Sequence, residues 1–160
     1  MNSVTSHVES LLKKLLVALS ALIVVMVTWQ VISRYVLQAP SSVTEEAARF
    51  LLIWISLFGA AYAYQTGSHL GLDILVNKLS TKGQAVAGIF SHLCVVGFAL
   101  NVMVFGGFSL VDLTMTPIQT SAALEIKMGY VYFAVPLSGL IIVLFGINKI
   151  KQLASQIWGQ

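Results

Sequence analysis

Charged residues are scarce in this sequence. Only 9% of its 160 residues are Asp, Glu, Lys or Arg, and 58% are hydrophobic, whereas soluble domains carry about 25% charged residues. A water-soluble fold of this length would keep roughly a third of its unfolded-chain surface exposed, which so apolar a composition could not supply in polar form. The shortage of charge therefore excludes an ordinary soluble domain and predicts that the main solvent of the chain is lipid.

Cysteine and the residue patterns of catalysis are also lacking. The single cysteine, Cys94, cannot form an internal disulfide or a cysteine metal cluster, and its apolar surroundings in the sequence predict a small buried hydrophobe. No HExxH, GxSxG, Walker or GxGxxG pattern occurs. The net charge of +3 is spread along the chain, without the basic stripe that nucleic-acid binding requires. We therefore expect no enzyme, no cofactor, no metal and no nucleic-acid partner.

Long uncharged runs make up most of what is present. Four runs of at least 19 residues contain no Asp, Glu, Lys or Arg. About 20 helical residues cross the hydrocarbon core at 1.5 Å each, and a helix pairs its backbone polar groups internally. The pattern predicts an all-α integral membrane protein, one membrane domain over residues 1–160, in contact with membrane lipids. Its four transmembrane helices are expected at about 15–36, 46–66, 84–111 and 128–148.

The first apolar run has two interpretations. Lys13 and Lys14 precede it, as in a secretory signal peptide. However, the run is long and ends in QVISRY, residues 30–35, without a small-residue cleavage site, so we expect an uncleaved anchor. An apolar stripe at helical spacing predicts a short amphipathic segment at the interface before this anchor, formed by Val4, Val8, Leu11 and Leu15.

Basic residues are unequally divided between the two sides of the membrane. With four spans, the two tails and the middle loop share one side, which has six Lys and Arg residues against three on the other. The positive-inside rule predicts that both termini are cytoplasmic. The residues counted are Lys13, Lys14, Lys78, Lys82, Lys149 and Lys151 against Arg34, Arg49 and Lys127.

Four charged residues, Arg34, Glu45, Glu46 and Arg49, lie between the first two apolar runs. Helix capping is one explanation: Ser42 and Glu45 have capping-box spacing, with Thr44 as a competing N-cap, and acids in a first turn suit the helix dipole. Glu45 and Arg49 are also spaced for a local ion pair. The other explanation is a partly buried, charge-balanced cluster in which Arg34 reaches both glutamates and shapes a surface for a partner.

A second polar group lies in GSHLGLDILVNKL, residues 67–79. His69 and Asp73 are four residues apart and could share a helix face as metal ligands, but a turn followed by a short interfacial helix over 72–79 fits the pattern better. Within the apolar runs the titratable candidate is His92. Asn101 follows it by nine residues, half a turn out of phase on a helix, so packing explains His92 better than a polar site.

Small residues are frequent inside the expected spans. Gly59 and its neighbours in the second run, and Gly139 and Gly146 in the fourth, would allow helix backbones to approach each other closely. Pro136 is acceptable within a span where neighbouring groups bond the freed carbonyl. This composition is typical of a chain built for helix packing.

Residues 34–80 resemble the small membrane subunit of tripartite ATP-independent periplasmic (TRAP) transporters, the DctQ family. The pattern is Arg-Tyr, Pro, Thr-Glu-Glu-x-x-Arg, Gly-Ala-Ala and Gly-x-His-x-x-x-Asp. One residue departs from it, since Val43 stands where the family usually has Trp. The matching positions are Arg34, Tyr35, Pro40, Thr44, Glu45, Glu46, Arg49, Gly59, Ala60, Ala61, Gly67, His69 and Asp73.

The resemblance implies a scaffold role in a sodium symporter of the bacterial inner membrane. The implied partners are a large membrane transport subunit and a periplasmic protein that delivers organic acids, such as four-carbon dicarboxylates, sialic acid or 2-oxo acids. The small subunit would hold no substrate site, and its charged residues would be structural or partner-facing. Two alternatives stay open: a stand-alone proton-dependent carrier using His92 and Glu45, and the membrane anchor of a redox complex using His69 and His92.

Overall fold

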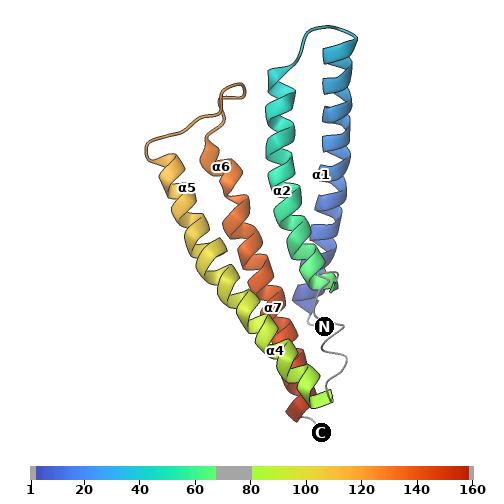
Figure 1. Cartoon of the computed structure of the whole chain (residues 1–160), viewed down its shortest axis with the longest axis vertical. Coiled ribbons are helices and arrows are strands. Elements are labelled where there is room, and N and C mark those ends of the chain that lie inside the picture. The colour runs from blue at the N-terminus through green and yellow to red at the C-terminus, as the bar shows by residue number, and fades with distance from the viewer. Residues whose placement is uncertain (1–2, 68–80, 159–160) are drawn as a thin grey trace.

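The computed structural model describes residues 3–67 and 81–158, which form helices joined by loops (Figure 1). Four helical segments of this part are long and apolar enough to cross a membrane, which confirms the predicted all-α membrane fold. His69, Asp73 and the interfacial helix expected at 72–79 lie outside the described residues. The four segments are Val4–Tyr35, Ser42–Thr66, Gly83–Met115 and Met128–Ser155.

Helix α1 (Ser3–Tyr35) is continuous, so the expected lead-in and the first span are one helix. Its inward face coincides with the predicted stripe only at Val8, which packs against the core. Thr5 and Leu12 are each only 3% exposed, whereas Val4 and Leu11 are 62% and 69% exposed. The buried positions contact other helices, which the periodicity of α1 alone could not indicate.

Helix α2 (Ser42–Thr66) begins one residue earlier than the capping box suggested. Ser41, in an extended conformation directly after Pro40, is the N-cap, and its side chain accepts a hydrogen bond from the backbone N–H of Thr44 at 3.4 Å. A serine oxygen in this position satisfies one of the free N–H groups of the first turn. The helix ends at Gly67, whose φ of 74° is in the left-handed region that favours glycine.

The third span is built from three consecutive elements: α4 (Thr81–Phe98), η1 (Ala99–Gly106) and α5 (Gly107–Met115). The η1 segment is a π-helix, a wider helical form that is rare and often found at functional sites. One side of this span packs against α7, and Figure 1 shows the two running side by side. Cys94 of α4 is exposed, contrary to the expected burial, because it lies on the other side of the span.

The fourth span consists of α6 (Met128–Tyr132) and α7 (Ala134–Trp158), separated at Phe133. Pro136 explains the break, since it has no N–H to bond to the carbonyl four residues before it. Its ring lies against Gly107, where an added Cβ would come within 2.8 Å of the proline Cδ.

Glycines bring the third and fourth spans close together. A Cβ on Gly139 would lie 2.7 Å from the Cβ of Met103, and one on Gly146 would collide with Val96. These two glycines therefore have the close-packing role expected of them. Gly59 does not, since nothing lies within 4 Å of its Cβ position.

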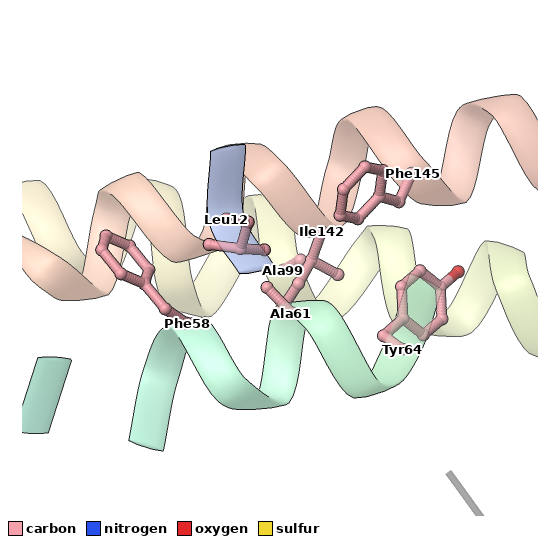
Figure 2. Close-up of a cluster of buried hydrophobic side chains, with 7 residues drawn as sticks. All are labelled: Leu12, Phe58, Ala61, Tyr64, Ala99, Ile142 and Phe145. Atoms are coloured by element: carbon pink, nitrogen blue, oxygen red, sulfur yellow. The ribbon is translucent and has the colours of Figure 1, made fainter. Parts of the chain in front are cut away.

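The core lies where α2, η1 and α7 meet the N-terminal half of α1 (Figure 2). Aromatic rings from α2 and α7 fill the space between the helices, with alanines where the backbones are closest. Helix α1 begins and α7 ends at the same end of the bundle (Figure 1), as four spans require. The core side chains are Leu12, Phe58, Ala61, Tyr64, Ala99, Ile142 and Phe145.

Candidate functional site

Arg34, Glu45 and Arg49 form the charged group at the turn between α1 and α2. A Glu45 carboxylate oxygen lies 3.7 Å from Arg34 Nη2, and the other oxygen lies 3.9 Å from Arg49 Nη2. All three side chains are more than half exposed, at 51% to 69%. Exposed pairs of this kind contribute about 0.2–1 kcal/mol, so the group is not the partly buried cluster that the sequence suggested.

Glu46 makes a different contact. Its carboxylate accepts backbone N–H bonds from Ala122, Ala123 and Leu124, at 3.2, 2.9 and 2.8 Å. The structure thus separates Glu46 from Arg34, with which it was expected to pair. The three donors belong to the loop between α5 and α6, which lies at the same end of the bundle as the α1–α2 turn (Figure 1).

Glu46 lies just after the first turn of α2, at the end of the bundle where the α5–α6 loop also lies. Its partner loop is held by two backbone bonds, from Ser121 N–H to the Ile126 carbonyl and from Met128 N–H to the Gln119 carbonyl. Consecutive N–H groups aimed at one anion form a favourable binding concavity. No sequence motif predicts this anion-binding loop, because its donors are backbone N–H groups.

Gln30 fixes the α1–α2 turn from within. Its side-chain Nε2 donates to the Thr44 carbonyl at 2.8 Å, and the Gln30 carbonyl accepts from the hydroxyl of Ser33, which is only 2% exposed. The sequence did not predict this direct contact, because the partner of Gln30 is a backbone carbonyl on another helix. The angle between α1 and α2 therefore rests on a carboxamide as well as on exposed ion pairs.

A second polar group lies near the opposite end of the bundle and joins α2, α4 and α7. The Tyr64 hydroxyl and His92 Nδ1 are 3.0 Å apart. Lys149 Nζ donates to the Tyr64 carbonyl at 2.7 Å and lies 5.0 Å from the centre of the Tyr64 ring. His92 therefore has a polar partner, and sequence reasoning could not find it because the partner is on another helix.

Helix α1 is attached at this end by two further hydrogen bonds. Gln65 Nε2 donates to Glu9 Oε2 at 3.1 Å, and Asn148 Nδ2 donates to Thr5 Oγ1 at 3.4 Å. Polar contacts thus concentrate at both ends of the bundle, with an apolar core between them. Among the described residues no group of three His, Cys, Asp or Glu side chains could hold a metal ion. The arrangement holds helices and loops in place.

Comparison with known proteins agrees with this architecture. The family described as "Tripartite ATP-independent periplasmic transporters, DctQ component" matches residues 23–156. A Haemophilus influenzae protein named as a TRAP transporter small permease is 26% identical over 94% of this chain and 91% of its own length. The sialic acid TRAP transporter small permease protein SiaQ of Vibrio cholerae is 27% identical over 89% of this chain and 81% of its own length.

A third relative is longer. The isethionate TRAP transporter permease protein DctMQ of Oleidesulfovibrio alaskensis is 29% identical over 91% of this chain but over only 23% of its own length. A counterpart of the whole small chain is thus part of a much larger permease polypeptide there. The family match begins within the first span, covers the other three spans and agrees with the resemblance carried by residues 34–80. This multi-pass membrane protein belongs to the DctQ component family of tripartite ATP-independent periplasmic transporters.

Proposed function

We propose that this chain is the scaffold subunit of a sodium-coupled importer of organic acids, and that it supports a separate, large membrane subunit which moves the substrate. The observation that carries the proposal is the DctMQ relative, in which a counterpart of this chain is covalently part of a permease about four times as long. Two chains that are fused in one organism commonly act as one complex in another.

The distribution of polar groups supports a scaffold role. The polar contacts at the two ends of the bundle join helices to each other, and the buried core cluster is apolar apart from the Tyr64 hydroxyl, which contacts His92. A membrane carrier needs ionisable groups along its substrate or ion path. His92 is occupied with Tyr64, and Glu45 is at the end of a span beside two arginines, which favours the scaffold over a stand-alone proton-dependent carrier.

The substrate class is inferred from the relatives. Their names include sialic acid, isethionate and C4-dicarboxylates, which are all small organic anions. We infer that the complex imports an anion of this class together with sodium, after delivery by a periplasmic substrate-binding protein. In this arrangement the α1–α2 turn and the α5–α6 loop, joined by Glu46, face the periplasm, and both termini are cytoplasmic.

Co-purification tests the scaffold role. A C-terminally tagged chain, expressed with the rest of its operon and extracted in a mild detergent, should bring down a much larger membrane protein in about equal amount. Proteoliposomes that contain both proteins and a binding protein should take up the organic acid only with a sodium gradient. Recovery of the small chain alone, with transport activity of its own, would overturn the proposal.

A further inference from the structure

The side of the third span that faces away from α7 carries an unusual polar group. Asn101 lies in η1, close to the middle of the span Gly83–Met115, and its side chain is exposed. Its Nδ2 donates to the Gly97 carbonyl at 2.9 Å, and this is its one side-chain hydrogen bond within the described residues. The carboxamide oxygen and the second N–H therefore face outward at a depth where the surroundings are hydrocarbon.

Two other exposed polar side chains within the spans, Thr28 and Ser109, differ from Asn101. The hydroxyls of Thr28 and Ser109 donate to carbonyls of their own helices, at 2.8 and 3.1 Å, which uses the one donor each hydroxyl has. A carboxamide has two donors and an oxygen with two lone pairs, so one bond leaves most of its capacity unused. In lipid an unused amide group has a free-energy cost, and a partner helix removes that cost by supplying the missing bonds.

The local backbone suits a partner at this position. The buried side of the third span is fixed on α7 by Gly107 and Gly139, which allow contact with Pro136 and Met103. The orientation of Asn101 is therefore set by close packing behind it. On the outer side Gly97 has nothing within 4 Å of its Cβ position, so another helix can approach closely beside the carboxamide.

We propose that the outward face of α4, η1 and α5, centred on Asn101, is the surface on which the large membrane subunit docks, through a helix that offers a hydrogen-bonding side chain or a free backbone carbonyl. The proposal rests on the proposed function, because it names the face of the scaffold that the partner covers. The alternative occupants of this face are lipid and a second copy of this chain, and the experiment below distinguishes both from the large subunit. The face consists of Phe98, Asn101, Val102 and Phe105, with Gly97 at its edge.

Two measurements on the complete transporter test the face. First, Asn101→Leu keeps the number and branching of the side-chain heavy atoms and removes the carboxamide. Interhelical hydrogen bonds in membranes are modest, so the small and large subunits should associate roughly threefold to thirtyfold more weakly. Thr28→Val, an equally exposed polar site on α1 whose hydroxyl bonds to its own helix, is the matched control and should leave association unchanged.

Second, photo-crosslinking identifies the occupant. Benzoylphenylalanine is placed at Phe105, which is 64% exposed on the proposed face of the third span. In a separate variant it is placed at Val25 of the first span, a comparison position that is 66% exposed. Illumination should link position 105 to the large subunit. Suppose that the wild-type chain co-purifies with the large subunit, so that the scaffold role stands. The docking face is then overturned if position 105 is linked only to lipid or to a second small chain. It is also overturned if Asn101→Leu associates with the large subunit as strongly as the wild type does. If the wild-type chain does not co-purify with the large subunit, the scaffold role fails and the docking face fails with it.

Discussion

The carboxylate of Glu46 accepts a hydrogen bond from the backbone N–H of Ala123, 77 residues further along the chain, at 2.9 Å. The neighbouring N–H groups of Ala122 and Leu124 converge on the same carboxylate. One acidic side chain at the start of α2 thereby positions the loop between α5 and α6. The start of α2 and the α5–α6 loop are thus joined by backbone N–H donors to a carboxylate and not by an ion pair with Lys or Arg.

The first prediction concerns this loop. Glu46→Gln leaves one acceptor oxygen and places an NH₂ group among the three N–H donors, so the loop loses its anchor. We expect the amides of Ala122, Ala123 and Leu124 to exchange with deuterium faster than in the wild type. Glu45→Gln, one residue earlier in the same helix turn, should not change their exchange. Equal exchange in Glu46→Gln and wild type would show that other contacts hold the loop.

The second prediction concerns the exposed arginines. Because the Arg34–Glu45 and Arg49–Glu45 pairs are more than half exposed, Arg34→Ala or Arg49→Ala should lower the free energy of unfolding by only about 0.2–1 kcal/mol. Equilibrium unfolding in detergent, repeated at high salt, measures this. A loss of about 3–5 kcal/mol, as for a buried pair, would contradict the exposed geometry.

The pairing itself can be tested separately. If Arg34 interacts with Glu45, the destabilisation caused by Arg34→Glu should be partly reversed by Glu45→Arg. Glu46→Arg should not reverse it, since Glu46 contacts the α5–α6 loop. The sequence left both glutamates open as partners of Arg34, because they are adjacent and follow it by eleven and twelve residues.

Composition and run length were sufficient to predict the fold. Uncharged runs of 19 or more residues require helices in lipid, and the four segments are present. The helix start after Pro40 was found within one residue, since capping chemistry is local. Predictions that depended on a single helix viewed alone failed. The amphipathic lead-in expected before the first span is part of one continuous α1, and Cys94, expected to be buried, is exposed.

The polar contacts were the least predictable part. His92 and Tyr64 are on different helices, 28 residues apart, and Glu46 is bonded to backbone groups of a loop without a recognisable motif. In both cases the partner is selected by the packing of whole helices, and no local pattern encodes it. The family resemblance identified the family, whereas the geometry of these contacts required the structure.

The third prediction concerns helix packing. A Cβ on Gly139 would lie 2.7 Å from Met103 Cβ and 3.3 Å from the Ala99 carbonyl oxygen, so Gly139→Ala forces α7 away from η1. Overpacking of this kind costs about 1–3 kcal/mol. Gly59→Ala, with nothing within 4 Å, should be neutral or stabilising by up to about 1 kcal/mol. Equal effects of the two substitutions on the free energy of unfolding would contradict the close approach at Gly139.

The fourth prediction separates assembly from transport. His92 is bonded to Tyr64 inside the bundle, and Asn101 faces outward from η1, so the two cannot form one site. His92→Ala should leave the sodium and substrate affinities of the complete transporter unchanged, as measured by uptake into proteoliposomes. A shift of about tenfold or more in the sodium dependence, equivalent to about 1.4 kcal/mol, would place His92 in the coupling mechanism.

The last prediction reverses an expectation from the sequence. Lys149 was counted with the C-terminal tail in the sequence analysis, but its Nζ donates to the Tyr64 carbonyl at 2.7 Å and lies over the Tyr64 ring. The carbonyl belongs to the last turn of α2, where a cation is favoured by the helix dipole. Lys149→Met retains the apolar stem and removes the charged donor.

The free energy of unfolding should therefore fall by about 1.5 kcal/mol in Lys149→Met, the lower end for a hydrogen bond from a charged group, because Lys149 is only half-buried. Lys151→Met, two residues later and exposed, is the matched control and should change the unfolding free energy little. Tyr64→Phe keeps the carbonyl and the ring, so it should preserve most of the Lys149 contribution and remove only the bond to His92. If Lys149→Met and Lys151→Met have the same stability, the lysine does not hold α7 against the end of α2.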